Sequence, residues 1–163
     1  MDISIRPATQ ADLETIRRIT VNAYAEAGYI DDEYAYNHIL TGVEANEKFA
    51  ALLVAELDGE VVGSVFLTRA GGEYSDVAHD GELEFRMLAV DPAVQRRGIG
   101  RRLVQAVLER ARGDAGTTGV VLTTGPGMVD QHSLYESLGF TRIPQRDFFL
   151  TNDFALHVYT IAL

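Results

Sequence analysis

The segment from Val90 to Leu103 constrains this chain more than any other, because it combines the end of an apolar run, a turn with two glycines and the start of a basic helix. Gly98 and Gly100 carry no side chain, so the backbone N–H groups around them can approach an anion closely. The first turn of the helix adds N–H donors and the positive end of the helix dipole. The segment therefore predicts a loop that binds a pyrophosphate.

Two other phosphate-binding loops precede a helix in a similar way, and this segment fits neither. A dinucleotide-binding fingerprint needs a third glycine where this chain has Leu103, and a Walker loop needs Gly-Lys-Ser or Gly-Lys-Thr. The only lysine of the chain is Lys48, which lies outside the segment. A turn without a ligand, followed by a solvated arginine face, remains the alternative for this segment taken alone.

A second segment, His132–Phe140, predicts a short helix that ends at Gly139, because glycine is the usual residue just beyond a helix C-terminus. Tyr135 lies in the middle of this helix. An isolated tyrosine on an amphipathic helix is most simply a half-buried aromatic residue of the core. Tyr135 therefore points to a function only in combination with the glycine turn.

Together, the two segments resemble the GNAT superfamily of acetyltransferases. The Gln-x-x-Gly-x-Gly pattern at Gln95–Gly100 is similar to the acetyl-CoA signature of that superfamily, whose matching helix carries Leu-Tyr followed by Gly-Phe, as at Leu134–Phe140 here. The resemblance covers nearly the whole chain and implies a single domain, 1–163. It implies an α/β (α+β) fold in which a mixed, twisted sheet of about seven strands is flanked by about four helices.

The resemblance implies acetyl-CoA as the cosubstrate and indicates which residues would bind it. The pyrophosphate would lie on the turn and the start of the helix, at Gln95, Arg96, Arg97, Gly98, Ile99, Gly100 and Arg101. The pantetheine arm would follow the edge of the preceding strand, with main-chain contacts from Leu88 and Val90. A main-chain N–H near Leu88 would stabilise the developing oxyanion.

The same resemblance gives Tyr135 the role of general acid, because the tyrosine of this helix commonly protonates the departing CoA thiolate. A tyrosine hydroxyl, with an unperturbed pKa of about 10, suits an alkyl thiolate. The match has a gap, since many members carry Asn and Ala at the positions where this chain has Met128 and Gln131. A CoA contact from that Asn side chain is therefore not expected here.

The acceptor amine needs a base, because an alkyl amine with a pKa near 10.4 is almost wholly protonated at pH 7 and freeing it costs about 4.6 kcal/mol. Period-two alternation along the central strand places Glu82, Glu84, Arg86, Leu88 and Val90 on one side. Glu84, directly or through a water, is the first candidate base, and Glu82 is the second. The alternative for Glu84 is an ion pair with Arg86, which would lower its pKa and make it a poorer base.

The composition limits the chemistry that the chain can use. A chain of 163 residues can bury a core as one domain. Without cysteine it has no disulfide, thiol nucleophile or Cys-based metal site. The histidines, His38, His79, His132 and His157, show no ligand spacing, so no metal is expected. No Ser-His-acid arrangement is evident either, which favours direct transfer within a ternary complex.

Charge is divided unevenly along the chain, whose formal net charge is −10. Residues 1–84 hold 17 acidic and 5 basic side chains, whereas residues 85–163 hold 7 acidic and 9 basic ones. If the first part lines the acceptor site, its field would attract a cationic amine. An acidic surface that only aids solubility is the alternative. The absence of a broad basic face argues against nucleic-acid binding.

Neither a membrane segment nor a leader is expected. No apolar run reaches the length that spans a membrane. The first residues do not combine a basic region with an apolar run, so a cytoplasmic location is the expectation.

Hydrophobic periodicity and turn residues predict strands alternating with helices. Strands are expected at 2–7, 49–57, 61–68, 83–90, 119–124, 141–149 and 155–162, and helices after Thr9, at 32–47, at 98–112 and around Tyr135. The turn at Asp58-Gly59 predicts a hairpin. The loop at 70–81 is either an acceptor-side lid or a mobile connection.

These observations predict an N-acetyltransferase that moves an acetyl group from acetyl-CoA to a primary amine of a small molecule, peptide or protein. One alternative is a GNAT-like module that binds acyl-CoA without transferring it, as a sensor or an interaction domain, and another is a scaffold that has lost CoA binding. Retention of Tyr135 favours catalysis, although fold alone does not fix function. A homodimer that exchanges its last strands between subunits stays open.

Overall fold

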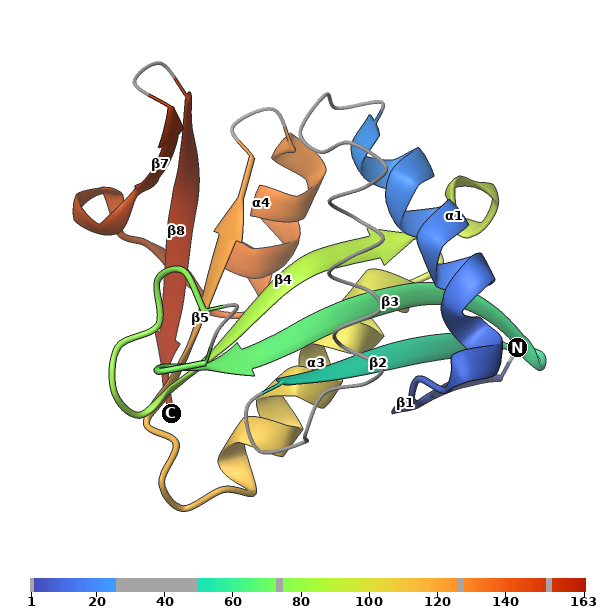
Figure 1. Ribbon diagram of the computed structural model, residues 1–163, viewed down its shortest axis with the longest axis horizontal. Helices are drawn as coiled ribbons and strands as arrows, with labels where there is room; N and C mark the ends of the chain where they lie inside the picture. Colours follow the sequence, from blue (N-terminus) through green and yellow to red (C-terminus); the bar gives the residue numbers. More distant parts are fainter. Residues whose placement is uncertain (1, 26–49, 73–74, 126–127, 152–153) are drawn as a thin grey trace. The chain divides into compact units, whose positions relative to one another are not determined.

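The computed structural model describes residues 2–25, 50–72, 75–125, 128–151 and 154–163 (Figure 1). The strands are β1 (Ile3–Pro7), β2 (Ala50–Leu57), β3 (Glu60–Arg69), β4 (Glu82–Val90), β5 (Gly119–Thr124), β6 (Thr141–Arg142), β7 (Phe148–Thr151) and β8 (Phe154–Ala162). The α-helices are α1 (Leu13–Ala25), α3 (Ile99–Arg112) and α4 (Val129–Ser137), and the 3-10 helices are η1 (Gln10–Asp12), η2 (Pro92–Val94) and η3 (Pro144–Arg146).

The eight strands of the described residues form a mixed sheet in the order β1-β2-β3-β4-β5-β8-β6, with β7 paired to β8. The predicted α/β fold is therefore confirmed. Contacts divide the chain into two compact units, the first made of Met1–Leu67 and Met87–Val107, the second of Thr68–Arg86 and Leu108–Leu163. Both β4 and α3 run from one unit into the other.

Helices cover both faces of the strands in the first unit, with α1 in front of β2 and β3 and α3 behind them in Figure 1. The turn between β2 and β3 has positive φ at both Asp58 (52°) and Gly59 (88°), as a type I′ hairpin turn requires. Gly63 allows α3 to approach β3, because a Cβ there would lie 3.1 Å from Leu103 Cδ1 and 3.2 Å from Ile99 Cγ2. This close packing fixes the start of α3, and with it the glycine loop.

In the second unit, α4 lies beside β5 and β8 (Figure 1), and its Tyr135 ring belongs to a cluster of aromatic rings. β4 pairs parallel with β5, and β8 pairs antiparallel with β5, β6 and β7. The ring of Tyr135 meets those of Phe85 and Phe140 edge to face, with centroid distances of 5.8 and 6.0 Å. Its centroid lies 6.1 Å from that of Tyr159. These rings fix α4, and therefore Tyr135, relative to the strands of this unit.

β4 departs from regular strand geometry near its middle. Met87 has a φ of 56°, which a residue other than glycine adopts in a strand only at an irregularity such as a bulge. The register with β5 covers Glu82–Phe85, whereas β4 itself continues to Val90. The φ of Met87 therefore interrupts the regular strand geometry on which the expected alternation from Glu82 to Val90 depends.

The expected strand at 141–149 is divided into β6, η3 and β7. Pro144 lacks an N–H for a ladder and has a fixed φ, so the chain turns at Pro144–Arg146 instead of continuing as a strand. This division accounts for the strand beyond the seven that were expected. The other strands were predicted to within one residue at each end. The helix expected at 32–47 lies outside the described residues.

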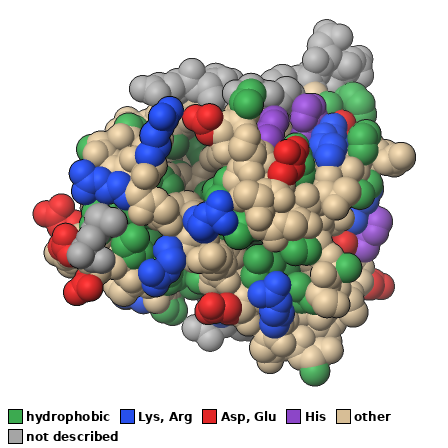
Figure 2. Space-filling view, turned by 180° about the vertical axis from the view of Figure 1, so that it is seen from behind, with side chains coloured by type: hydrophobic (Ala, Val, Ile, Leu, Met, Phe, Trp, Pro, Cys, Tyr) green, Lys and Arg blue, Asp and Glu red, His purple; other side chains and the backbone are tan. Residues whose placement is uncertain are grey.

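Side chains of both charges are exposed on the surface. Figure 2 shows Lys and Arg side chains interspersed with Asp and Glu on the face seen from behind. Two of the ion pairs are Arg69 with Asp114, at 2.9 Å, and Arg146 with Glu82, at 2.7 Å. Within the described ranges, no helix combines the length and the apolar character that crossing a membrane requires.

Candidate active site

The glycine loop, Gln95–Gly98, has the backbone geometry of an anion-binding turn. Arg96 and Gly98 have left-handed φ values of 68° and 80°, a conformation that glycine adopts readily and arginine rarely. Left-handed residues in such a turn allow successive backbone N–H groups to converge on one anion. A Cβ at Gly98 would meet no atom within 4 Å, so the space beside the loop is open.

α3 presents its first N–H groups next to this loop. The Arg102 N–H donates to the Gly98 carbonyl at 3.0 Å, so the N–H groups of Ile99, Gly100 and Arg101 precede the helical bonds. Ile99 is only 1% exposed and anchors the turn in the core. The first turn of α3 contains no acidic residue, so nothing there opposes the positive potential of the helix dipole.

The arginines around the loop have different surroundings. Arg96, Arg97, Arg101 and Arg102 are all exposed, and Arg102 donates to the Ile3 carbonyl of β1 at 3.1 Å. Exposed guanidinium groups can turn toward a phosphate and bind it in a bidentate manner. The residues predicted to hold the pyrophosphate thus form one continuous segment of the first unit.

The ladder between β3 and β4 defines which edge of β4 carries Leu88 and Val90. The Asp91 N–H donates to the Val62 carbonyl of β3 at 2.8 Å. In an extended strand, the N–H and C=O of one residue point to the same side, and the side alternates from residue to residue. Ala89 therefore faces β3 as Asp91 does, and the main-chain groups of Leu88 and Val90 face the other edge. That edge is the one predicted to contact pantetheine.

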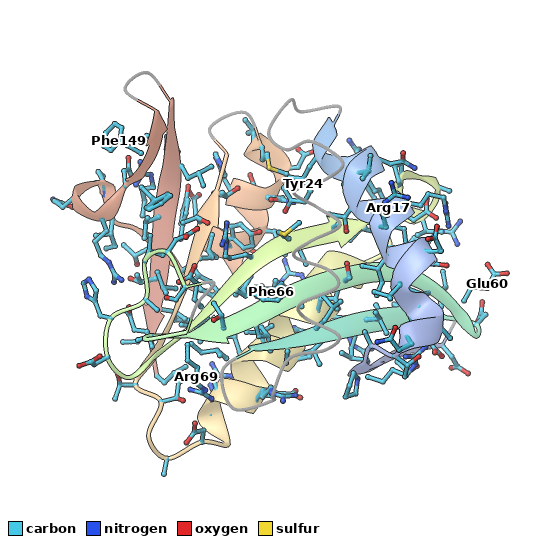
Figure 3. All side chains as sticks on the ribbon, in the orientation of Figure 1. Arg17, Tyr24, Glu60, Phe66, Arg69 and Phe149 are labelled. Atoms are coloured by element: carbon cyan, nitrogen blue, oxygen red, sulfur yellow. The ribbon has the colours of Figure 1, made fainter. Side chains whose placement is uncertain are left out.

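Tyr24 lies beside this edge and was not predicted as a site residue. Its hydroxyl donates to the Leu88 carbonyl at 2.7 Å, from a side chain that Figure 3 shows reaching from α1 toward β4. Both residues belong to the first unit. The two residues are 64 positions apart, so no local sequence pattern could have indicated the contact.

Tyr135, the predicted general acid, is only 2% exposed and is therefore buried rather than half-buried. Its hydroxyl donates to Gln131 Oε1 at 3.4 Å, and Thr124 Oγ1 donates to the same atom at 3.4 Å. Gln131 is one of the two positions at which the chain departs from the pattern of the superfamily. That departure, together with the i, i+4 spacing that places Gln131 and Tyr135 on one face of a helix, could have identified Gln131 as the partner of Tyr135.

The C-terminal end of α4 agrees with the sequence prediction, whereas the helix begins at Val129, before the expected start at His132. Gly139 has a φ of 100°, its N–H donates to the Glu136 carbonyl at 3.1 Å, and the Phe140 N–H donates to the Tyr135 carbonyl at 3.0 Å. This pair of bonds is a Schellman motif, which confirms the predicted helix end at Gly139. At the other end, Met128 is the N-cap and makes no side-chain capping bond.

Glu84, the first candidate base, is fully buried. Its Oε1 accepts hydrogen bonds from Ser75 Oγ at 3.0 Å, from the Val77 N–H at 3.1 Å and from the Ala78 N–H at 3.0 Å. The Asp76 N–H donates to it as well, at 3.2 Å. These contacts are those of a structural anchor for the loop, and the role of Glu84 as a base stays a prediction.

The segment 75–79 is therefore fixed to β4 instead of forming a free connection. Arg86, which is 7% exposed, forms an ion pair with Asp76 at 2.9 Å. The Arg146 guanidinium donates to the Val77 carbonyl at 2.6 Å. Arg86 was considered as an ion-pair partner for Glu84, and it provides instead a second attachment of the same segment. We call 75–79 the anchored loop.

Glu82, the second candidate base, is also engaged by this loop. It accepts hydrogen bonds from the His79 N–H and from Arg146, both at 2.7 Å. Burial alone would raise the pKa of Glu82, but the bonds from Arg146 and from the His79 N–H outweigh burial, so the pKa is lowered. A carboxylate with a lowered pKa is a weaker proton acceptor than an ordinary glutamate.

His132 of α4 and His157 of β8 lie side by side, with ring centroids 5.7 Å apart. His132 Nε2 lies 2.9 Å from the Gly125 carbonyl, and since a carbonyl only accepts, this nitrogen carries the proton. The pKa of His157 is lowered, first by burial and then by the nearby charge of Arg142, and both favour the neutral ring. Within the described residues, no group of three or more His, Asp or Glu side chains could hold a metal ion.

The fold is shared with solved acetyltransferase structures. The chain matches a crystal structure of PaiA N-acetyltransferase from Thermoplasma acidophilum in complex with coenzyme A, with a TM-score of 0.74, 18% identity and 100% of both chains covered. It also matches a GNAT family acetyltransferase from Brucella melitensis in complex with acetyl-CoA, with a TM-score of 0.67, 25% identity, and 99% of this chain and 88% of that chain covered. The fold therefore defines the class as that of GNAT acetyltransferases.

Sequence comparison identifies the family. Residues 48–142 match the model of the acetyltransferase (GNAT) domain. N-acetyltransferase 8 of Homo sapiens is 33% identical over 103 residues, which are 63% of this chain and 44% of that protein. Three curated acetyltransferases, N-acetyltransferase 8 among them, match this chain over only 27% to 52% of their own lengths. The chain belongs to the GNAT acetyltransferase family.

Proposed function

We propose that this chain is an acetyl-CoA-dependent N-acetyltransferase that acts on a primary amine. The observation that carries the proposal is the glycine loop, with left-handed Arg96 and Gly98 and open space beside Gly98. Membership of the family supports acetyl transfer as the reaction. The acetyl-CoA complex of the Brucella melitensis relative supports acetyl-CoA as the cosubstrate.

The first unit would bind the cosubstrate. The N–H groups of Gly98, Ile99 and Gly100 would bind the pyrophosphate oxygens, and the exposed Arg97 and Arg101 would add charge-assisted bonds. Main-chain contacts from the Leu88 and Val90 edge would hold the pantetheine arm, and Gln95 and Arg96 would complete the turn.

In the transfer step, the amine nitrogen attacks the thioester carbonyl carbon, and a C–N bond forms as the C–S bond breaks. A main-chain N–H near Leu88 stabilises the negative charge that develops on the carbonyl oxygen. The CoA thiolate leaves and takes a proton from the Tyr135 hydroxyl. The bond from this hydroxyl to Gln131, at 3.4 Å, is long and therefore weak, so the hydroxyl can exchange it for the thiolate.

The proton that the amine loses goes to a base. Glu84, acting through a water, stays the prediction for this base. The contacts of Glu84 with Ser75, Val77 and Ala78 favour loop anchoring over proton transfer. Glu82 is disfavoured by its lowered pKa. Release of the proton to solvent is consistent with both observations.

The acceptor is a primary amine, with a cationic one favoured by the acidic excess of residues 1–84. The alternative proposal is a non-catalytic module that binds acyl-CoA, and Tyr135 favours the enzyme. A cytoplasmic location and a homodimer stay predictions.

Amine-dependent thiol release from acetyl-CoA tests the proposal. We expect release from the wild-type chain with at least one member of a panel of small amines and N-terminal peptides. Tyr135→Phe, which removes one hydroxyl, should lower kcat roughly 100-fold and leave acetyl-CoA affinity unchanged, because general acid catalysis contributes about that factor. Binding without release from the wild type would favour the non-catalytic module, and undiminished kcat in the variant would remove the acid role of Tyr135.

A further inference from the structure

We propose that Tyr24 is a positioning residue for acetyl transfer, which holds the Leu88 edge of β4 in the geometry that the thioester carbonyl requires. The inference rests on the proposed function, and it adds a residue on α1 that neither the glycine loop nor the α4 motif indicates.

The contact itself is short and specific. Tyr24 Oη donates to the Leu88 carbonyl oxygen at 2.7 Å, which is the most frequent length of a good O–H···O bond. The side chain is half-buried and extends from the last turn of α1 toward β4 (Figure 3). Because the ring is half-buried, the hydroxyl can occupy only few positions. The Tyr24 hydroxyl therefore holds the Leu88 carbonyl in place, instead of moving with that carbonyl.

The direction of the Leu88 main-chain groups shows which edge of β4 the Tyr24 hydroxyl contacts. Because Asp91 and Ala89 face β3, Leu88 faces the opposite edge with both its C=O and its N–H. The Tyr24 hydroxyl therefore lies at the edge on which the proposed oxyanion contact would form. A shift of the Leu88 carbonyl would turn the adjoining peptides and move that N–H.

The surroundings of Leu88 show why a fixed carbonyl matters at this point. Met87, directly before it, has a φ of 56°, a conformation that costs about 1 kcal/mol or more and is kept only when neighbouring contacts impose it. The register that fixes the first part of β4 against β5 ends at Phe85. The bond from Tyr24 is one of the contacts that set the backbone after the irregular residue.

Tyr24→Phe removes the hydroxyl and keeps the ring, so it separates positioning from packing. We expect kcat to fall roughly 10-fold to 100-fold, since a misplacement of about 1 Å at a reacting group can cost 100-fold. The KM for the amine, the affinity for CoA and the Tm should stay close to those of the wild type. A purely structural role would instead lower the Tm and leave kcat per folded molecule unchanged.

Ser137→Ala is the matched control, because Ser137 Oγ also donates to a main-chain carbonyl, that of Leu134, at 2.7 Å, but at an exposed position at the end of α4. It removes the same kind of bond and should leave kcat unchanged. A second readout needs no acceptor: calorimetry should show a smaller preference for acetyl-CoA over CoA in Tyr24→Phe than in the wild type.

The outcomes separate the two proposals. A lower kcat, or a smaller preference for acetyl-CoA, in Tyr24→Phe but not in Ser137→Ala supports the positioning role. A kcat within twofold of the wild type, together with an unchanged preference, overturns it. A wild-type chain that binds neither acetyl-CoA nor CoA overturns the proposed function, and that failure is seen before any variant is measured.

Discussion

Two loops of this chain hold their shapes in opposite ways. The glycine loop is exposed, and its geometry comes from its own backbone, with left-handed Arg96 and Gly98 before the first turn of α3. The anchored loop, 75–79, takes its position from side chains of β4, namely the buried Glu84 and Arg86. The first loop has the geometry of a turn that binds an anion, and the second uses its N–H donors on the protein itself.

The comparison shows what each loop can do. N–H groups directed at open space can bind a phosphate. N–H groups directed at a buried carboxylate stabilise the fold, because each bond to a charged group contributes about 1.5–3 kcal/mol and the carboxylate cannot be left unpaired without a larger loss. We therefore propose ligand binding for the glycine loop and structural support for the anchored loop.

The largest effect is expected at Glu84. In Glu84→Gln, the amide NH2 would face N–H donors that now bind the carboxylate, so the free energy of unfolding should fall by about 3 kcal/mol. Chemical denaturation followed by circular dichroism measures this change. Acetyl-CoA affinity per folded molecule should stay the same if the two loops act separately.

Glu60→Gln is the matched control, since Glu60 is exposed near the β2–β3 turn and labelled in Figure 3. It should change the free energy of unfolding by less than about 0.5 kcal/mol. If Glu84→Gln were equally mild and also abolished turnover, Glu84 would be the base, and the anchoring role would be wrong.

A smaller, pH-dependent effect is expected at Glu82, whose lowered pKa lies below the ordinary 4.5. A carboxyl whose pKa is lowered by folding stabilises the fold above its ordinary pKa, and the stabilisation is lost as the pH falls through the folded value. Glu82→Gln should therefore be less stable than the wild type by about 2 kcal/mol at pH 7. The difference should shrink as the pH falls below about 5 and through the folded pKa of Glu82. Urea titrations across this range measure it, and a difference independent of pH would contradict the account.

The sequence allowed the local features to be predicted. The Gly-containing turn before α3, the helix end at Gly139 and the hairpin at Asp58-Gly59 each depend on residues that are neighbours in the chain. The resemblance of these short motifs to the GNAT superfamily then supplied the order of strands and helices, which the fold confirms. The general acid and the cosubstrate residues rest on the same local motifs and stay predictions.

Features that depend on distant residues could not be predicted. The alternation of Glu82, Glu84 and Arg86 was visible, but the donors of the anchored loop on Glu84 were not. The bond from Tyr24 to Leu88 joins two elements that only the folded sheet brings together. Methionine usually continues a strand, so the residue type of Met87 does not indicate an irregular backbone. The expected alternation was therefore continued through this position.

Calorimetric titration of acetyl-CoA into the wild type, into Arg97→Glu/Arg101→Glu and into Arg110→Glu/Arg112→Glu tests the central claim most directly. Both variants carry the same change of charge, the first in the glycine loop and the first turn of α3 and the second in the last turn of α3. If the glycine loop binds the pyrophosphate, the wild type binds acetyl-CoA and the Arg110→Glu/Arg112→Glu variant binds it equally well. The Arg97→Glu/Arg101→Glu variant binds acetyl-CoA about tenfold more weakly, which is a loss of about 1.4 kcal/mol in binding free energy. No binding by the wild type, or equal weakening in both variants, would contradict the claim.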